Sequence, residues 1–139
     1  MAYADYAYYT ATYLGTAIAE ADFPRLALRA SDYIDYMTRA KAAKATEESV
    51  LDALSKACCA VAEHIQVEER NAAVAAGSAE RAISGGSGEL KSESVGGYSV
   101  SYTTGADYAN ANTAKAEADA RRSILIRYLA NTGLLYRGC

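Results

Sequence analysis

The sequence predicts a mainly α-helical protein, a small bundle of about four helices with a β-hairpin inserted between the third and last helices and an extended C-terminal tail. Of its 139 residues, 31 are alanine, the best helix former, against 22 leucine, isoleucine and valine residues together. Apolar residues also recur at three- and four-residue steps. The length favours a single domain over residues 1–139. Because alanine buries little apolar surface, we expect neighbouring molecules to supply part of the stability.

The first segment, about residues 3–21, is rich in tyrosine, and its helix is expected to end near Gly15. Tyr6, Tyr9 and Tyr13 fall at i, i+3 and i+7, which would give one helical face a tyrosine stripe. The threonines of this segment weaken its helical preference.

The second helix is expected to begin after Asp22, an N-cap residue, with Pro24 in its first turn, where a missing N–H costs nothing. Its end is expected between Thr38 and Ala40. The apolar residues that recur at helical spacing are Phe23, Leu26, Ala27, Ala30, Ile34 and Met37.

The third helix is expected to be the longest. Thr46 would cap it, and Glu47 and Glu48 suit the helix dipole in the first turn. Gly77 is a candidate end, with resumption through Ile83 as the alternative. The expected apolar stripe is Leu51, Leu54, Cys58, Val61, Ala62 and Ile65.

Residues 84–105 break the helical pattern and are expected to be a linker with an inserted hairpin. Glycine and serine dominate 84–88, a composition typical of flexible linkers. Gly96 and Gly97 then separate two alternating segments, which predicts a tight hairpin turn. In the second of these segments Tyr98, Val100 and Tyr102 share one face. A lone two-stranded hairpin is marginal in water, so we expect another surface to cover it.

The last helix is expected to begin at about Asp107 or Asn112 and to end at Asn131, with Gly133 just beyond it. Residues 132–139 follow as an apolar tail, and we expect this tail to dock on something because free termini are otherwise disordered. The expected contact face of the helix is Ala114, Ala118, Arg121, Leu125, Tyr128 and Leu129.

Residues suited to catalysis are few. His64 is the only histidine, and nothing in the sequence supplies the positioned partner that a general base needs. Cys58 and Cys59 are adjacent, so on a helix they point about 100° apart and cannot both bind one metal ion together with His64. The glycine-rich stretch 84–88 lacks the Gly-Lys-Ser/Thr ending of a phosphate loop. We therefore expect no enzyme activity, no cofactor and no metal site, and interpret the two cysteines as small buried hydrophobes.

Charge and hydropathy exclude further classes. The net charge of −3 and the pI near 5.2 have the wrong sign for a protein whose whole surface binds nucleic acid. No apolar run approaches the roughly 18 to 20 residues of a membrane span. The N-terminal sequence lacks the basic and apolar regions of a secretory signal. Three cysteines, two of them adjacent, form no disulfide framework, which favours synthesis in a reducing, intracellular compartment.

Two surface features can be interpreted either as purely structural or as functional. The N-terminal tyrosines would stack nucleobases only beside a basic groove, and residues 1–20 contain no lysine or arginine, so protein contact is favoured. Arg121, Arg122 and Arg127 form the only basic cluster. They fit a solvated helix end or pairing with an acidic neighbour equally well.

Four segments give the chain a resemblance to a known family. It resembles the head–tail connector proteins of long-tailed bacteriophages, also called adaptor or head-completion proteins. The two most specific phrases are Glu-Ser-Val-Gly-x-Tyr-Ser-Val-Ser-Tyr and Thr-Gly-Leu-Leu-Tyr-Arg-Gly. The four segments span most of the chain: Tyr3-Ala-Asp-Tyr-Ala-Tyr-Tyr with Tyr13-Leu-Gly15, Phe23-Pro-Arg-Leu with Arg29-Ala-Ser-Asp-Tyr-Ile-Asp-Tyr-Met-Thr38, Leu90-Lys-Ser-Glu-Ser-Val-Gly-Gly-Tyr-Ser-Val-Ser-Tyr102, and Leu129-Ala-Asn-Thr-Gly-Leu-Leu-Tyr-Arg-Gly138.

The resemblance implies a structural virion protein of the phage neck, made in the bacterial cytoplasm and placed between capsid and tail. It implies a ring of about twelve identical subunits that docks on the portal protein and extends the DNA channel. Such a ring accepts the next neck or tail protein, a stopper or tail terminator, and double-stranded DNA passes through it without sequence-specific binding. No membrane is involved.

Residues of the hairpin and the tail are therefore expected to contact the portal or a neighbouring subunit. Two alternatives stay open: a small helical regulatory or DNA-binding protein that works as a monomer or dimer, with Arg121, Arg122 and Arg127 at its centre, and a stopper or tail-completion protein of the adjacent neck layer. The expected interface residues are Tyr98, Val100, Tyr102, Leu134, Leu135, Tyr136 and Arg137.

Overall fold

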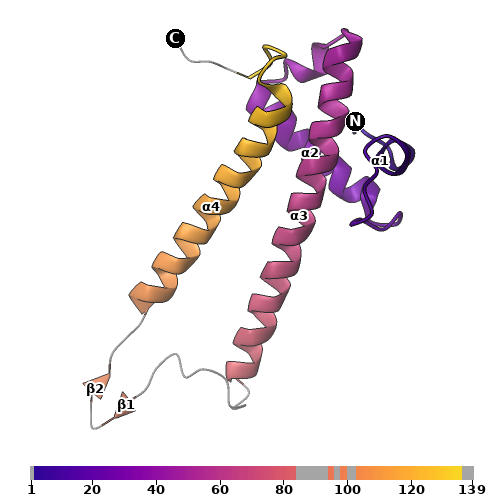
Figure 1. Cartoon of the computed structure of the whole chain (residues 1–139). Coiled ribbons are helices and arrows are strands. Elements are labelled where there is room, and N and C mark those ends of the chain that lie inside the picture. Colours follow the sequence, from indigo (N-terminus) through magenta and orange to yellow (C-terminus); the bar gives the residue numbers. More distant parts are fainter. Residues whose placement is uncertain (1, 84–93, 96–97, 100–102, 136–139) are drawn as a thin grey trace. The chain divides into compact units, whose positions relative to one another are not determined.

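The computed structural model describes residues 2–83, 94–95, 98–99 and 103–135 (Figure 1). The chain is mainly helical, as the sequence predicts. Contacts divide it into two compact units, Met1–Val67 with Ala120–Cys139, and Glu68–Asp119. In chain order the elements are α1 (Tyr6–Ala11), α2 (Phe23–Thr38), the 3₁₀-helix η1 (Ala42–Lys44), α3 (Glu48–Ile83), β1 (Ser94–Val95), β2 (Tyr98–Ser99) and α4 (Thr103–Leu129).

Helix α1 is a short helix within the expected tyrosine-rich segment. The Asp5 carboxylate caps it by accepting a hydrogen bond from the Tyr8 N–H at 2.7 Å. The helix ends at Ala11, and Leu14 then takes a left-handed backbone conformation with φ of 61°. This conformation is incompatible with a right-handed helix, and residues 12–21 consist of turns, bends and irregular backbone.

Helix α2 has the bounds that the sequence predicts. It begins directly after Asp22, carries Pro24 in its first turn and ends at Thr38. The expected cap is wrong in one respect, because the Asp22 side chain makes no capping hydrogen bond. The Phe23 N–H instead donates to the Ala19 carbonyl at 3.0 Å. At the other end Arg39 and Ala40 both adopt left-handed conformations, which stop the helix.

Helix α3 begins at Glu48, two residues after the expected cap Thr46, and the Glu47 carbonyl accepts the first hydrogen bond, from Leu51 N–H at 2.9 Å. Of the two expected ends, Gly77 is wrong and the alternative, continuation through Ile83, is confirmed. One glycine costs a helix interior only about 1 kcal/mol, and the neighbouring alanines are the strongest helix formers.

The apolar stripe of α3 is buried as expected from Leu54 to Ile65, but its first member differs. Leu51 is 41% exposed, and Val50 takes the buried position in that turn. Two further residues that the stripe did not include, Ala57 and Cys59, are also buried.

Helix α4 begins at Thr103, earlier than either expected start, and ends at Leu129, two residues before Asn131. Its expected contact face is only partly correct. Leu125 and Leu129 are fully buried, whereas Ala114 and Ala118 are exposed. Just past the helix Gly133 adopts a left-handed φ of 71°, the conformation for which glycine is favoured after a helix end.

The strands β1 and β2 contain two residues each and pair antiparallel, with Ser94 opposite Ser99 and Val95 opposite Tyr98. The rest of the expected linker and hairpin, residues 84–93, 96–97 and 100–102, lies outside the described residues. The hairpin over 84–105 therefore stays a prediction.

The core of the first unit collects side chains from α1, α2, η1, α3 and α4. At its N-terminal end the Tyr9 ring lies 4.9 Å from the Phe23 ring and stacks on Tyr13 at 5.8 Å, with Tyr6 at 6.0 Å. The three tyrosines thus meet at the core, but they do not form the expected stripe on one helical face, because α1 ends at Ala11 instead of near Gly15 and Tyr13 lies beyond it. The fully buried large apolar side chains of the core are Tyr9, Phe23, Leu26, Ile34, Leu54, Val61, Leu125 and Leu129.

Two glycine-to-alanine substitutions should change stability in opposite directions. A Cβ at Gly15 would overlap the Tyr9 ring, so Gly15→Ala should lower the free energy of unfolding by about 1–3 kcal/mol. A Cβ at Gly77 meets open space inside a helix, so Gly77→Ala should raise the free energy of unfolding by roughly 0.5–1 kcal/mol. Urea denaturation followed by helical circular dichroism measures both, and equal effects of the two substitutions would contradict the packing around Tyr9.

Candidate docking surfaces

The interface residues expected from the sequence are only partly described. Tyr98 lies in β2, paired with Val95. Leu134 and Leu135 are half-buried and pack against the core of the first unit. Both leucines therefore have partners within the chain, contrary to the expectation that the tail has none. Val100, Tyr102, Tyr136 and Arg137 lie outside the described residues.

A hydrogen-bonded turn after α4 positions the two leucines. The Thr132 N–H and hydroxyl both donate to the Leu129 carbonyl, at 3.1 Å and 2.7 Å. The Leu134 N–H in turn donates to the Thr132 hydroxyl at 3.4 Å. With Gly133 in its left-handed conformation, this turn lets the chain leave the helix and return to the core at Leu134 and Leu135.

The N-terminal segment is held by a set of hydrogen bonds that sequence patterns did not reveal. Four phenols, here called the tyrosine clamp, donate to carboxylates of α2 and α3. The donors are Tyr3 to Asp35, Tyr8 to Asp52 at 2.6 Å, Tyr9 to Glu63 at 2.8 Å and Tyr13 to Glu63 at 3.4 Å. Hydrogen bonds to an ionised acceptor are stronger than neutral ones, so the clamp fixes α1 and its flanking residues on α2 and α3.

Tyr9 is the centre of the clamp. Its side chain is fully buried, and besides donating to Glu63 its hydroxyl accepts the N–H of Ala17 at 2.9 Å and of Ile18 at 3.1 Å. The Tyr9 hydroxyl thereby provides an acceptor for two N–H groups of the irregular segment that follows α1, and it connects this segment to α3 through Glu63.

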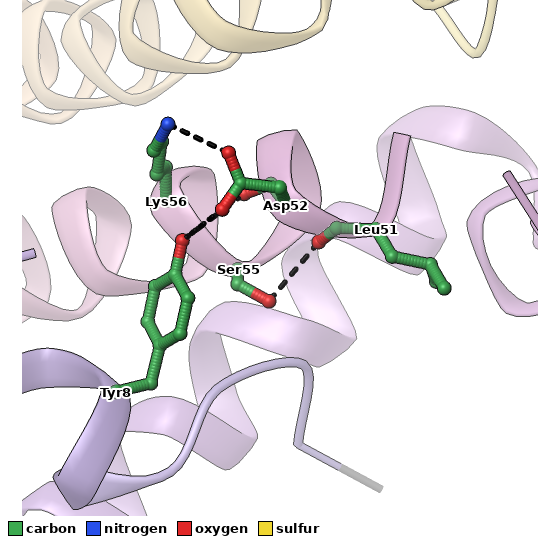
Figure 2. A network of polar contacts seen from close by, with 5 residues as sticks. All are labelled: Tyr8, Leu51, Asp52, Ser55 and Lys56. Atoms are coloured by element: carbon green, nitrogen blue, oxygen red, sulfur yellow. Dashed lines mark hydrogen bonds and ion pairs between the residues drawn. The ribbon is translucent and has the colours of Figure 1, made fainter. Parts of the chain in front are cut away.

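Asp52 gathers a second group of polar contacts at the surface (Figure 2). Its carboxylate accepts from the Tyr8 hydroxyl and pairs with Lys56 at 2.6 Å. The neighbouring Ser55 hydroxyl lies within hydrogen-bond distance of the Leu51 carbonyl, at 3.0 Å, and of the Tyr3 carbonyl, at 2.8 Å. An open pocket of about 400 Å³ lies beside this group. Its lining residues are Ala2, Tyr3, Ala4, Asp5, Tyr8 and Ser55.

The environment of the clamp keeps its phenols neutral. Burial, followed by the bonded carboxylate, raises the pKa of Tyr3 and of Tyr8 far above the ordinary value of 10. Burial and the charge of Glu63 raise the pKa of Tyr13 in the same way. Each phenol is therefore a hydrogen-bond donor at every physiological pH.

Cys58 and Cys59 are both fully buried on α3. The Cys58 thiol lies 3.5 Å from the Ser31 hydroxyl and 3.5 Å from the Ala27 carbonyl. Burial raises the pKa of Cys58, and burial with the neighbouring Cys58 raises the pKa of Cys59 to about 12. Protonated thiols are poor nucleophiles, which agrees with the interpretation of both cysteines as small hydrophobes.

The surface of the described part of the chain carries several exposed large apolar side chains. Tyr36 on α2 is 78% exposed and Val74 on α3 is 70% exposed. The others are Leu14, Leu28, Leu51, Val67 and Ile126.

Of the three arginines in the basic cluster of α4, one packs on an aromatic ring and two are exposed to solvent. The Arg121 guanidinium lies 5.4 Å from the centre of the Tyr33 ring, a cation–π contact with α2. Arg122 and Arg127 are exposed. The cluster therefore does not present all three cations on one free surface.

Within the described residues no group of three or more histidine, cysteine, aspartate or glutamate side chains is placed to hold a metal ion. Nor is any helix in those residues both long and apolar enough to cross a membrane. Comparison of the chain with protein-family models, with curated proteins and with solved structures finds no match.

Tyr9→Phe should destabilise the protein although it keeps the ring. The substitution removes the donor to Glu63 and the acceptor for the Ile18 N–H, so we expect the free energy of unfolding to fall by about 1–3 kcal/mol. Tyr6→Phe is the matched control, because Tyr6 contacts the same rings of Tyr9 and Phe23 through its own ring, and a change within about 0.5 kcal/mol is expected. Urea denaturation of both variants tests this, and equal losses would show that the Tyr9 hydroxyl contributes nothing specific.

Alkaline pH should lower the stability that the tyrosine clamp contributes. Because the folded protein raises the pKa of Tyr3, Tyr8 and Tyr13 above the unfolded value of 10, the stability they contribute is complete below pH 10 and is lost progressively above it. We expect the urea midpoint to fall as pH rises through and beyond 10. In a Tyr8→Phe, Tyr13→Phe variant this fall should be shallower, and a variant as steep as the wild type would contradict the assignment.

Proposed function

We propose that the chain is a head–tail connector (adaptor) subunit of a phage neck, a docking protein rather than an enzyme. About twelve copies would form a ring on the portal, extend the DNA channel and accept the next neck or tail protein. The observation that carries the proposal is the set of large apolar side chains left exposed on a small, alanine-rich helical chain.

These exposed side chains favour a protein that works in an assembly. Single exposed apolar residues are ordinary on a monomer, but Tyr36, Leu14 and Val74 each expose 70% or more of their surface. Burying such side chains stabilises an assembly by about 25 cal/mol for each Å² of apolar surface. A structural subunit that is covered by identical neighbours satisfies this requirement.

The chain end supplies the second argument. Leu134 and Leu135 are half-buried on the core. The proposal assigns the residues that follow them, Tyr136 and Arg137, to contacts with the portal or a neighbouring subunit. Likewise the finer part of the expected fold, the hairpin around β1 and β2, is proposed to be covered by such a partner, because a lone two-stranded hairpin is marginal in water.

The charge of the chain agrees with a channel that DNA passes through. With a net charge of −3 the protein does not neutralise phosphates over its whole surface, and phosphate neutralisation is what makes DNA adhere. A regulatory DNA-binding protein would need a basic face, and Arg121, one of three candidate residues for it, packs on Tyr33 instead.

The proposal is tested by the mass of the complex that the chain forms with a portal ring. The wild type should bind the ring in about twelve copies, and a chain that ends at Leu135 should bind it at least about tenfold more weakly, because it keeps the core leucines and loses Tyr136 and Arg137. Cys139→Ser, with the rest of the tail intact, is the matched control and should bind normally.

Circular dichroism must show the same helical content for all three proteins. Absence of wild-type binding to the portal overturns the proposal, and salt-sensitive binding to duplex DNA by the isolated chain would favour the regulatory alternative. Binding of the shortened chain at wild-type strength would show that the tail assignment is wrong.

A further inference from the structure

The outer side of α2 has the composition of a protein interface. Arg25, Leu28, Asp32 and Tyr36 follow each other at three- and four-residue steps, with Arg29 beside them, so the five share one face of the helix, here called the α2 face. All five side chains are exposed, Tyr36 by 78% and Leu28 by 47%.

This face is separate from the core of its own unit. The opposite side of α2 buries Leu26, Ala27, Ala30 and Ile34 completely. Tyrosine and arginine are the residue types enriched at the centres of protein interfaces, where a rigid aromatic ring and a guanidinium supply contact area and directed hydrogen bonds. The α2 face therefore combines two apolar anchors with two guanidiniums and one carboxylate.

A second exposed patch of the same unit has the complementary composition. Leu51 is 41% exposed and lies three and four residues after Glu48 and Glu47 at the start of α3. Both glutamates are exposed, and Lys44 of η1 precedes them, exposed as well. This patch, here called the α3 start, thus joins one apolar anchor to two carboxylates and one ammonium, the reverse of the charges on the α2 face.

We propose that the α2 face of one copy of the chain binds the α3 start of a second copy. The inference names the neighbour contact of the ring and so rests on the proposed function. Two reversed charge patterns on one molecule favour a second copy over nucleic acid, because Asp32 lies within the α2 face and would repel phosphates. The two patches are different surfaces, so the contact is head-to-tail and repeats from copy to copy, closing into a ring when the rotation allows.

Charge reversal of each patch and mixing of the variants tests the contact. Arg25→Glu with Arg29→Glu places five carboxylates across the interface, Asp32 included, and Glu47→Lys with Glu48→Lys places five cations there, Lys44 included. Each double variant alone should associate at least about tenfold more weakly than the wild type in sedimentation equilibrium. An equimolar mixture should regain association, because every α2 face then meets an α3 start of opposite charge.

The apolar anchor has a matched control. Leu28→Ser should weaken association, whereas Ile126→Ser, which changes an aliphatic side chain of nearly equal exposure on α4, should leave it unchanged. Circular dichroism establishes that each variant folds. Tyr36→Ser, at a side chain that is 78% exposed, should weaken association as Leu28→Ser does. Equal weakening by Leu28→Ser and Ile126→Ser would contradict the proposal.

Three outcomes overturn the inference: a wild type that stays monomeric up to about 1 mM, double variants that associate like the wild type, or a mixture that does not recover. The copy number on the portal ring separates this failure from failure of the connector role. If wild-type and charge-reversed chains bind the portal ring in the same copy number, the connector role is retained and the proposed contact is wrong. If the chains associate in the charge-dependent way described but do not bind the portal, the proposed contact is retained and the connector role is wrong.

Discussion

The fold of the first unit depends on phenol–carboxylate hydrogen bonds between the N-terminal segment and two helices. Alanine gives α3 and α4 strong helical preference but little bulk to bury, so the helices alone build a thin core. Tyr9 fills the remaining space with a fully buried ring, and its hydroxyl reaches Glu63. A buried phenol left without a partner costs about 1–3 kcal/mol, so the carboxylates of α2 and α3 stabilise this aromatic core by accepting the phenol protons.

The helices could be predicted from the sequence because their signals are local. The position of Asp22 and Pro24 defines the start of α2, and apolar spacing identifies the buried side of α3 from Leu54 onward. Gly77 alone did not decide between the two expected ends of α3, and the helix runs on to Ile83 because one glycine among alanines does not outweigh the preference of its neighbours. In the first turn of α3 the sequence predicts Leu51 as the buried residue, whereas the structure buries Val50. Periodicity does not distinguish these two neighbours where the core ends.

The tyrosine clamp was beyond sequence reasoning. Its bonded residues lie 32 to 54 positions apart in the chain, and periodicity indicates which side of a helix is apolar but not which acid a phenol will meet. The candidate interface was predictable only in part. The tail was recognised as apolar, yet the turn through Thr132 and Gly133 that returns Leu134 and Leu135 to the core depends on hydrogen bonds of the Thr132 hydroxyl and amide that composition does not encode.

The left-handed pair Arg39 and Ala40 has a consequence for motion. The N–H groups of Arg39, Ala40, Lys41 and Ala42 all donate to groups of Tyr36, Asp35 and Thr38, so the connection from α2 to η1 has its amides saturated. A non-glycine residue in this conformation costs about 1–2 kcal/mol and persists only where its surroundings enforce it. These four hydrogen bonds therefore oppose any reorientation of η1 relative to the end of α2.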